Sequence, residues 1–460
     1  MKKRIIFIPV ETISRELDYK IVLASNLLSK DNIIFLGQHD FLDSILGIFK
    51  SGSYIGKHVF KDSFPSPIDL YQKYKRNNFS ILWTHEEGGI YAGNRKNWKK
   101  VLDELLDPSV LMDDDAVLTW GEFQKNHYSE KSTITPINVG VPRFNLSKES
   151  NLRAIIKKFN RVKEKDYVLI NTNFSTVNYH SDREEMLLNL INSFKSETDN
   201  IQLAKHFASQ NKIFSHFIEL VTDLALKHPN QLFIFRPHPT ESSKIYKLLF
   251  SSLSNVKVTK QFSAVEWMDQ CKCLIQNGCT TSLEAYFMGK RVVNFFPFED
   301  KDSINVTKEL GISCSTIQEV ESIVFNEIDS PQNPLNTLEE LPELIKNLNS
   351  DYQEDIFTKE LIKLVNTKDL FSFNMLLITL RIQATSLLVN IVNAIKYIPR
   401  YFLFKAKWKD YQMAVSHFPG FSKSEVTSKF NLLSEESSQE HNLKFFGKNL
   451  VMVSQKLKND

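Results

Sequence analysis

Residues 232–239 read Leu-Phe-Ile-Phe-Arg-Pro-His-Pro, an apolar run that ends in an arginine and a histidine flanked by prolines. A short unbroken apolar run is typical of a strand that is buried on both faces of a parallel sheet. Proline fixes φ and excludes helix, so Arg236 and His238 stay at the carboxyl end of this strand. Ligands of open α/β sheets bind at that end. The stretch therefore predicts an α/β fold and provides the first candidates for its site.

The same pattern recurs along the chain. Short apolar runs alternate with amphipathic stretches, first up to residue 141 and again after Pro142-Arg143-Phe144. The expected strands are 5–10, 33–36, 80–83, 116–120, 137–141, 167–170, 232–235, 256–258, 273–276 and 292–296. The expected helices include 16–29, 69–76, 97–106, 214–227 and 281–288. This alternation predicts two doubly wound parallel sheets. We therefore expect the GT-B fold class, in which two Rossmann-like domains, residues 1–145 and 146–350, face each other across a cleft.

Residues 351–460 are expected to form a helical C-terminal appendage. Arg381 is the only charged residue from 371 to 395, whereas residues 396–409 combine aromatic side chains with five basic ones. Such a mixture is typical of a segment that lies in a membrane interface. It is equally typical of a helix packed across both domains, and both interpretations stay open. Asn374, Gln383 and two further asparagines argue against a true membrane span.

Bulk composition limits the function classes. The 460 residues carry a net charge of +3, which is too small to indicate nucleic-acid binding. The four cysteines contain no CxxC pair, so neither a zinc site nor a disulfide framework is predicted. The apolar run 5–10 is interrupted at once by Glu11, unlike a signal peptide. We therefore expect a cytoplasmic protein with reduced thiols and no bound metal or cofactor.

Polar residues follow several of the expected strands. Arg236 and His238 alternate with prolines and should point the same way, where they could hold a phosphate. The strand 273–276 leads into Asn277-Gly278-Cys279-Thr280-Thr281-Ser282-Leu283-Glu284, in which Thr281 and Glu284 have the spacing of a capping box. A helix start of this kind is a ready anion site. We therefore predict a nucleotide-phosphate site formed by Arg236, His238, Asn277, Gly278, Thr280, Thr281, Ser282 and Glu284.

The first domain offers carboxylates at its strand ends. The strand 80–83 leads into Thr84-His85-Glu86-Glu87-Gly88-Gly89. Two adjacent carboxylates should repel each other and raise one pKa, which suits proton transfer. Glu87 is the expected reacting group, Glu86 its tuning partner, and Glu11 a possible assistant from the end of the first strand. Arg15, Arg143 and the run Asn171-Thr172-Asn173 are expected to contact donor or acceptor.

Together, these segments resemble the bacterial surface carbohydrate biosynthesis protein family. The resemblance spans most of residues 4–300. It rests on Pro9-Val10-Glu11, Arg15-Glu16-Leu17-Asp18, Glu86-Glu87-Gly88, Val141-Pro142-Arg143-Phe144, Asn171-Thr172-Asn173-Phe174, Arg236-Pro237-His238-Pro239 and Asn277-Gly278-Cys279-Thr280-Thr281. His417-Phe418-Pro419-Gly420 is also similar to the family. The acidic turn, the His-Pro and the hydroxyl-rich helix start are similar to those of bacterial sialyltransferases and β-Kdo transferases.

The resemblance implies a glycosyltransferase of surface polysaccharide biosynthesis. Its donor would be a CMP-activated sugar, such as a Kdo-like or other ulosonic acid, used without a metal. Its acceptor would be a glycan or a lipid-linked glycan, and the enzyme could lie peripherally on the inner face of the cytoplasmic membrane. Glu86 or Glu87 would be base or nucleophile, while His238, Thr280, Thr281 and Ser282 would hold phosphate. Two departures, His85 before the acidic pair and Val141 in place of an expected asparagine, bear on fine specificity.

Three other interpretations share these features. A CDP-polyol phosphotransferase of the teichoic-acid type has a similar Arg-x-His-Pro strand and hydroxyl-bearing helix start. A UDP-sugar epimerase uses the same fold and needs no acceptor. A non-catalytic scaffold at the membrane would keep the fold, although the acidic pair favours an enzyme.

Overall fold

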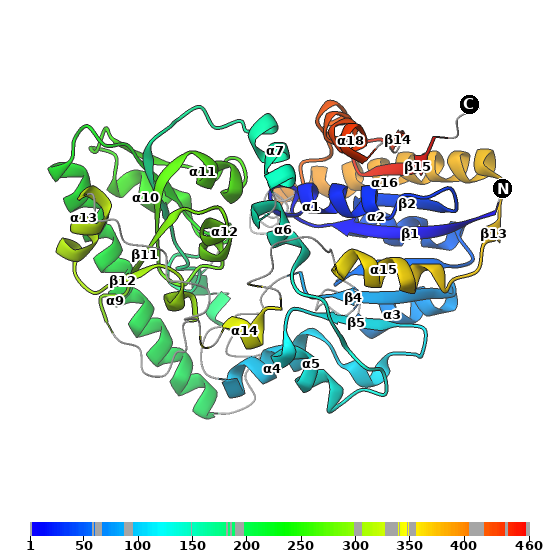
Figure 1. Cartoon of the computed structure of the whole chain (residues 1–460), viewed down its shortest axis with the longest axis horizontal. Coiled ribbons are helices and arrows are strands. Elements are labelled where there is room, and N and C mark those ends of the chain that lie inside the picture. Colours follow the sequence, from blue (N-terminus) through cyan, green and yellow to red (C-terminus); the bar gives the residue numbers. More distant parts are fainter. Residues whose placement is uncertain are drawn as a thin grey trace. The chain divides into compact units, whose positions relative to one another are not determined.

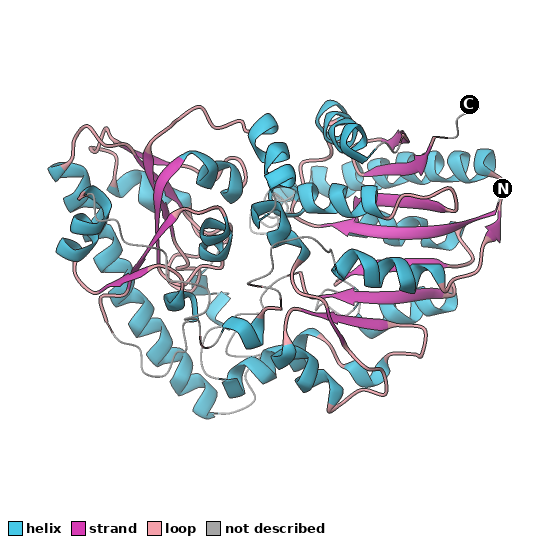
Figure 2. Cartoon of the chain, in the orientation of Figure 1, coloured by secondary structure: helices cyan, strands magenta, loops and turns pink. Residues whose placement is uncertain are grey.

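The computed structural model divides the chain into two compact units. The N-terminal unit contains Met1–Tyr91, Lys96–Leu146 and Glu340–Asp460, and the central unit contains Ala92–Arg95 and Ser147–Glu339. The structure describes residues 2–57, 59, 67–86, 95–148, 150–180, 183–184, 186–188, 197–298, 306–326, 339, 341–346, 348, 356–403, 418–437 and 440–456. Both units are layered α/β folds in which helices cover a sheet (Figures 1 and 2). The predicted fold class, two Rossmann-like domains of the GT-B type, is confirmed in its two sheets.

The sheet of the N-terminal unit has the strand order β14-β15-β2-β1-β3-β4-β5-β6. Its strands are β1 (Lys2–Val10), β2 (Asn32–Gln38), β3 (Gly52–Gly56), β4 (Phe79–Thr84), β5 (Ala116–Thr119), β6 (Ile137–Asn138), β14 (His441–Phe446) and β15 (Leu450–Gln455). The strands from β2 to β6 are mutually parallel. A short strand, β13 (Phe371–Ser372), pairs antiparallel with the start of β1. The sequence predicted every parallel strand of this sheet except β3, whose Gly-Ser-Tyr-Ile-Gly composition is a weak strand signal.

The helices of this unit connect its strands and cover the sheet. They are α1 (Ile13–Asn26), α2 (His39–Ile45), α3 (Pro67–Arg76), α4 (Arg95–Leu105), α5 (Glu122–Ser129), α6 (Pro142–Lys148), α14 (Leu341–Leu344), α15 (Ile356–Asn366), α16 (Met375–Leu403) and α18 (Lys423–Ser437). In α1 the buried residues Leu17, Ile21 and Ala24 recur at helical spacing, as in a helix that packs on the body of its unit. The α1 helix thereby fixes the polar residues of its first turns beside the ends of the strands.

The sheet of the central unit is wholly parallel, with the order β12-β11-β10-β7-β8-β9. Its strands are β7 (Tyr167–Asn171), β8 (Phe233–Arg236), β9 (Val256–Val258), β10 (Cys271–Gln276), β11 (Arg291–Phe295) and β12 (Ile312–Cys314). Its helices are α7 (Ser150–Phe159), α9 (Glu197–Lys227), α10 (Ser243–Leu249), α11 (Ala264–Gln270), α12 (Thr281–Phe287) and α13 (Ile317–Phe325).

Alternation along these strands builds a separate core on each face of the central sheet. Val168 and Ile170 of β7 pack with residues of α9, α10 and α13. Tyr167 and Leu169 of the same strand pack with residues of α11 and α12 on the other face. Each fully buried large apolar side chain contributes roughly 1.5–3 kcal/mol. The unit is therefore doubly wound, as predicted.

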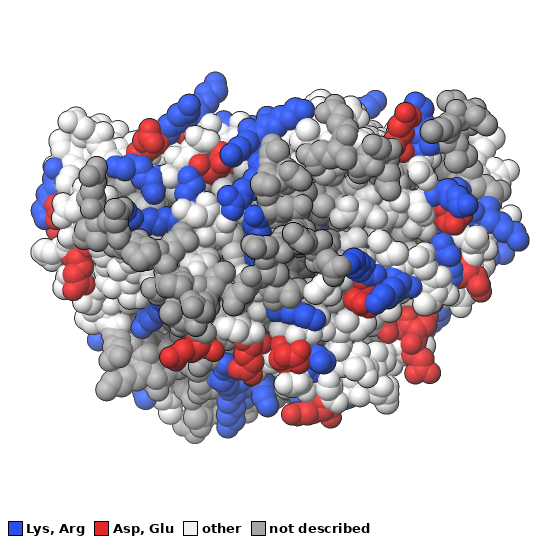
Figure 3. Space-filling model, in the orientation of Figure 1, with Lys and Arg blue, Asp and Glu red and all other residues white. Residues whose placement is uncertain are grey.

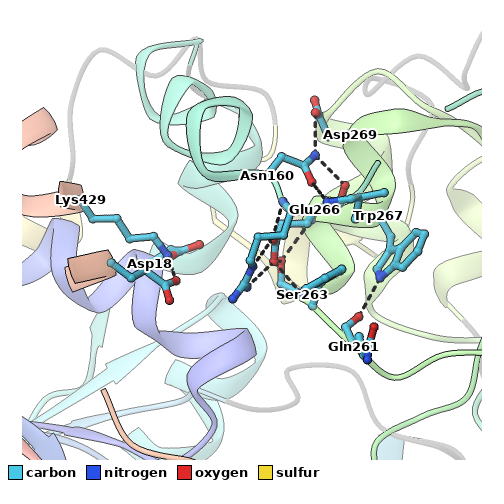
Figure 4. Close-up of polar contacts among 12 residues, drawn as sticks. Asp18, Asn160, Gln261, Ser263, Glu266, Trp267, Asp269 and Lys429 are labelled. Carbon is cyan, nitrogen blue, oxygen red and sulfur yellow. Dashed lines mark hydrogen bonds and ion pairs between the residues drawn. The ribbon is translucent and has the colours of Figure 1, made fainter. Parts of the chain in front are cut away.

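The C-terminal segment is only partly the helical appendage that was predicted. It is helical in α15, α16 and α18, but β15 also pairs antiparallel with β2, with Met452 opposite Phe35. Lys429 of α18 lies 2.6 Å from Asp18 of α1 (Figure 4). The segment thus belongs to the N-terminal unit, because an apolar β-hairpin supplies the hydrogen-bonding partner that the edge of β2 would otherwise lack.

Charge is mixed on the molecular face that Figure 3 shows, where acidic and basic side chains both occur over both units. Within the described residues, no helix has the length and apolarity that a bilayer crossing demands. In the predicted interfacial segment, 397–408, the backbone up to Leu403 is described and forms the end of α16. Residues 404–408 lie outside the described residues.

Candidate active site

Each parallel sheet has one point at which the strand order reverses. In the N-terminal unit this point lies between β1 and β3, and in the central unit between β7 and β10. Helices leave on opposite faces of the sheet there, so the carboxyl ends of the two strands are left open to ligand. Glu11 follows β1 and Lys57 follows β3, and their side chains form an ion pair of 3.0 Å. Predicted site residues therefore lie at the reversal point of each unit.

A buried lysine organises the polar residues of the N-terminal unit. Lys20 of α1 is 1% exposed, and its Nζ lies 2.9 Å from Glu16 and 2.8 Å from Glu86. The same ammonium donates a hydrogen bond to the Pro9 carbonyl at the end of β1. A buried charge is tolerated only with such partners. Lys20 therefore joins the ends of β1 and β4 through the first turns of α1.

The two carboxylates on Lys20 differ in their acidity. Burial raises the pKa of Glu16, but Lys20 and Arg15 outweigh burial and hold this pKa well below its usual range. Burial also raises the pKa of Glu86, and the charge of Glu16 adds to this rise. The Lys20 cation opposes it but does not cancel it, so the pKa of Glu86 lies above its usual value. Glu16 is thus the permanent anion of the pair, and Glu86 is the group better suited to accept a proton.

Among the described residues, burial and the Glu16 charge raise this pKa. The repulsion expected between Glu86 and Glu87 stays a prediction. Glu87, the expected reacting group, lies outside the described residues together with Gly88 and Gly89. Its role therefore stays a prediction.

Arg15 and Arg143 both contact this cluster. Arg15 lies 2.9 Å from Glu16, and an Arg143 Nη donates to the backbone carbonyl of Glu86 at 3.5 Å. His85 has another role: it is buried, contacts the Tyr128 hydroxyl at 3.0 Å and packs edge-on against Trp83. The histidine before the acidic pair therefore belongs to the core of the unit.

A pocket opens beside Glu86 within the N-terminal unit. Its lining includes Tyr19 of α1, Thr84 and Glu86 at the end of β4, Arg143 of α6 and Phe357 of α15. The rest of the lining is mostly apolar and also includes His85: Leu23, Ile55, His85, Leu118, Gly140, Val141 and Pro142. A carboxylate and a guanidinium thus border a mostly apolar cavity, which is the usual make-up of a small-ligand site.

In the central unit, amides and hydroxyls at the ends of β7 and β10 hold one another. The amide of Asn171 donates to the Thr281 hydroxyl at 3.0 Å, and the Asn277 carbonyl oxygen accepts from the backbone N–H of Asn173 at 3.0 Å. The side-chain oxygen of Asn171 is buried and has no hydrogen-bond partner within the described residues. Buried polar atoms rarely lack a hydrogen-bond partner. The reversal point of this sheet therefore presents an unused acceptor.

Glu241 ties the β7 and β8 ends together, and the sequence analysis missed it. Its buried carboxylate accepts hydrogen bonds from the Thr172 hydroxyl at 3.0 Å and from the backbone N–H groups of Phe174 at 2.9 Å and His238 at 3.0 Å. The Tyr246 hydroxyl is a further donor. Thr172 and Glu241 are therefore structural partners, and Glu241 fixes the backbone on which His238 stands.

Arg236 and His238 have different neighbours. Arg236 donates to the Phe262 carbonyl at 3.1 Å, and its buried Nε has no partner within the described residues. Burial lowers the pKa of Arg236 to about 10, with the nearby Cys279 and Glu266 opposing that shift. The Nδ1 of His238 lies 2.7 Å from the Thr240 hydroxyl and accepts from the Thr240 N–H at 3.3 Å. In the neutral imidazole the proton is therefore on Nε2.

The start of α12 differs from the predicted capping box. Thr280 is the N-cap and makes no side-chain capping bond, while Thr281 accepts from Asn171 instead. Ser282 is fully buried, and its hydroxyl donates to the Cys279 carbonyl at 2.8 Å, which is a structural role. Because α12 has only seven residues, its macrodipole is small. A phosphate site here would depend on side chains rather than on a helix dipole.

The turn before α12 is shaped by Gln276 and Gly278. Gly278 has a φ of 98°, a left-handed conformation that favours glycine. The side-chain oxygen of Gln276 accepts from the backbone N–H groups of Gly278 and Cys279, each at 2.5 Å. Glu284 is buried and is one of the charged neighbours of Arg236. The predicted residues 277–284 and Arg236 are therefore close to one another.

Metal ligands were not predicted. Across the described part of the chain, no group of three or more His, Cys, Asp or Glu has a geometry that could hold a metal ion. The described cysteines are all free thiols.

Several central residues had no signal of their own in the sequence. Read singly, these residues occupy ordinary positions. Glu16, Tyr19 and Lys20 are on a helix face, Lys57 is at a strand end, and Glu241 is in a loop. The i, i+4 spacing of Glu16 and Lys20 predicts an exposed pair on a helix. Their burial follows from packing against the ends of β1 and β4, which a single sequence does not contain.

Comparisons with known proteins give a distant likeness. No protein-family model matches the chain, and no curated protein matches it. Among solved structures, the chain is similar to the UDP-GlcNAc 2-epimerase of Methanocaldococcus jannaschii in complex with UDP-GlcNAc and UDP, with 13% identity, coverage of 80% of this chain and 100% of that one, and a TM-score of 0.41. It is similar to the wall teichoic acid polymerase TagF, with 10% identity, coverage of 79% and 88%, and a TM-score of 0.41. It is also similar to the E. coli ADP-heptose LPS heptosyltransferase II, with 9% identity, coverage of 65% and 86%, and a TM-score of 0.29.

Proposed function

We propose that the chain is a glycosyltransferase of surface polysaccharide biosynthesis. It transfers a Kdo-like or other ulosonic acid from a CMP-activated donor to a glycan or lipid-linked glycan acceptor, without a metal. The observation that carries the proposal is the composition of the strand ends next to the two reversal points. Glu86, after β4, is a buried carboxylate of raised pKa beside a pocket, and Arg236, at the end of β8, is a partly buried arginine with an unused donor.

The proposed reaction uses these groups in turn. Glu86, or its neighbour Glu87, removes the proton of an acceptor hydroxyl, and the oxygen attacks the anomeric carbon of the donor. The bond from this carbon to the phosphate oxygen breaks, and CMP leaves with the electron pair. Arg236 and His238 offset the charge of the single departing phosphate. The hydrogen-bond donors of these two side chains suit a CMP leaving group, which carries less charge than a nucleoside diphosphate.

The nucleotide assignment can be tested by calorimetry with CMP. Arg236→Ala and His238→Ala should each weaken CMP binding by about tenfold or more, because each removes a hydrogen-bond donor to the phosphate. Arg291→Ala is the matched control, since Arg291 begins β11 and donates to the Ile323 carbonyl. Unchanged CMP affinity in both test variants, with the fold intact, would remove the phosphate-site assignment.

The donor class is separable by a panel of CMP-Kdo, CMP-sialic acid, CDP-glycerol and UDP-GlcNAc. We expect release of CMP from a CMP-sugar, at a rate that EDTA leaves unchanged. Turnover of CDP-glycerol would instead identify a polyol phosphotransferase, and epimerisation of UDP-GlcNAc an epimerase. Activity lost with EDTA and restored by Mg²⁺ or Mn²⁺ would contradict the metal-independent mechanism.

Peripheral association with the inner face of the cytoplasmic membrane is part of the proposal. It is supported by one face of α16, on which large apolar side chains are exposed: Leu376, Leu377, Leu380, Leu387, Leu388, Ile391 and Val392. The aromatic and basic run 396–409 follows directly in the sequence. An apolar helix face continued by aromatic and basic residues is typical of interfacial helices.

A further inference from the structure

The pocket beside Glu86 contains a polar group that the proposed chemistry does not use. Tyr19 lines this pocket and is 6% exposed. Its hydroxyl is buried and has no hydrogen-bond partner within the described residues. Leaving a buried hydroxyl unpaired costs roughly 1–3 kcal/mol. A group that the fold leaves unpaired in a cavity is therefore a candidate for pairing with a ligand.

Other buried tyrosines of this chain are paired by the fold itself. The hydroxyl of Tyr71 donates to Asp115 at 2.6 Å, and that of Tyr74 donates to Asp43 at 2.6 Å. The Tyr246 hydroxyl donates to Glu241 in the central unit. Tyr19 has no such partner among the described residues, and it lines a pocket.

The surroundings of Tyr19 select the kind of ligand. Burial raises the pKa of Tyr19 well above its usual range, and the charges of Glu86 and Glu16 raise it further, so the phenol stays a neutral donor. Glu86 offers a carboxylate acceptor in the same pocket. Arg143 adds a donor to the lining, and an ammonium ion could not accept from Tyr19. A hydroxyl group can accept from the phenol and donate to the carboxylate at once.

We propose that this pocket binds a hydroxyl group of a saccharide or polyol, which accepts from Tyr19 and donates to Glu86. Leu23, Ile55, Leu118 and Val141 add apolar side chains to the lining beside these polar groups, the usual combination in a site for a small polar ligand. The inference rests on the proposed function in one respect, that the bound hydroxyl is the one that the acceptor contributes to the reaction. Tyr19 is then a binding residue that orients this hydroxyl toward Glu86.

The experiment compares Tyr19→Phe with Tyr71→Phe in the full chain. The probes are methyl β-galactoside, methyl β-N-acetylglucosaminide, methyl β-glucoside and glycerol, titrated by saturation-transfer NMR. We expect the wild type to bind at least one of these polyols. Tyr19→Phe should weaken the binding by about tenfold, the usual effect of losing one hydrogen bond, and Tyr71→Phe should leave it unchanged. Glu86→Gln should also weaken binding, because the amide replaces a charged acceptor.

Thermal unfolding supplies a second measurement on the same variants. Because the Tyr19 hydroxyl has no partner in the described structure, Tyr19→Phe should keep or raise the melting temperature, whereas Tyr71→Phe should lower it. Loss of stability in Tyr19→Phe would show that the hydroxyl already has a structural partner and would overturn the inference. Equal polyol affinity of Tyr19→Phe and wild type, or no polyol binding by the wild type, would also overturn it.

CMP titration of the same proteins separates this inference from the proposed function. If the wild type binds polyols through Tyr19 but no nucleotide, the proposed transferase is wrong and the pocket stands. If CMP binds and Tyr19→Phe leaves polyol binding unchanged, the nucleotide site stands and the pocket assignment is wrong.

Discussion

At the residue scale, Lys20 and Glu86 decide how the proposed base would respond to pH. A base must be ionised to act, so turnover should decline as the pH falls through the raised pKa of Glu86. The Lys20 cation favours the ionised carboxylate, so Lys20→Met should raise this pKa further. We therefore expect the acidic limb of the kcat/KM profile to move to higher pH in Lys20→Met. Glu86→Gln should lose transfer by about a hundredfold or more, the scale of losing a general base.

Lys429→Met is the control for this prediction. Lys429 is also a buried lysine of the N-terminal unit, held by Asp18 and Glu425 at 2.6 Å each. Its loss should lower stability and leave the pH profile unmoved. A folded Lys20→Met enzyme whose acidic limb stays in place would show that Glu86 is not the titrating base.

Glu241 is the second residue whose role depends on its contacts. Burial raises the pKa of Glu241, but its four hydrogen-bond donors, from Thr172, Phe174, His238 and Tyr246, oppose that rise. Glu241→Gln turns one acceptor oxygen into a donor NH₂ that faces other donors. We expect about 1–3 kcal/mol less stability in urea unfolding and weaker CMP binding, because the β7 and β8 ends lose their common partner.

Glu321→Gln is the matched control for Glu241→Gln. Glu321 pairs with Lys227 at 2.7 Å and His228 at 3.0 Å on the surface of the same unit. An exposed pair of this kind contributes about 0–1 kcal/mol. A Glu241→Gln protein as stable as Glu321→Gln would contradict the role assigned to Glu241.

At the element scale, the exposed apolar face of α16 gives a direct test of membrane binding. Leu380 and Leu387 are 53% and 63% exposed and lie on the same side of the helix. If this face enters a membrane interface, Leu380→Asp with Leu387→Asp should abolish sedimentation with vesicles that contain anionic lipid. Gln383→Asn, a neutral substitution at the exposed polar position between these two leucines, removes no apolar side chain and should bind nearly as the wild type does. Wild-type binding by the double variant would exclude α16 as the docking element.

The strands of the C-terminal segment explain why point substitutions are preferable to truncation. Removing the chain after residue 370 would delete β15 and leave the edge of β2 unpaired. It would also remove Lys429, which pairs with Asp18 of α1, the helix that carries Lys20. Loss of membrane binding in such a truncated protein would therefore report on the fold as much as on the tail.

At the scale of the whole molecule, the two units have related but distinct strand orders. The parallel strands of the N-terminal unit run in the order β2-β1-β3-β4-β5-β6, which is that of flavodoxin-like sheets. Those of the central unit, read from β9, run in the 3-2-1-4-5-6 order of dinucleotide-binding sheets. Each order places a single reversal point beside polar residues, so each unit has its own candidate ligand site. This division fits a transferase that handles an acceptor and a nucleotide with different units.

The sequence by itself determined the fold class, most strands and the positions of Glu11, Glu86, Asn171, Arg236 and Asn277 at strand ends. These predictions succeeded because apolar periodicity and the turn residues Gly and Pro act over a few residues of chain. The position at which α12 starts was predicted correctly, but its capping box was wrong, because Asn171, the residue that donates to Thr281, is distant in sequence.

Only the tertiary structure decided which polar groups are paired. Lys20 joins Glu16 to Glu86, Glu241 joins Thr172 to His238, and Tyr19 is left without a partner among the described residues. It also decided that β15 completes the N-terminal sheet, because the edge of β2 can be recognised only once the order of the strands is known. The physical reason is common to all of these: burial and hydrogen bonding depend on contacts between residues far apart in the chain, and a local pattern does not contain them.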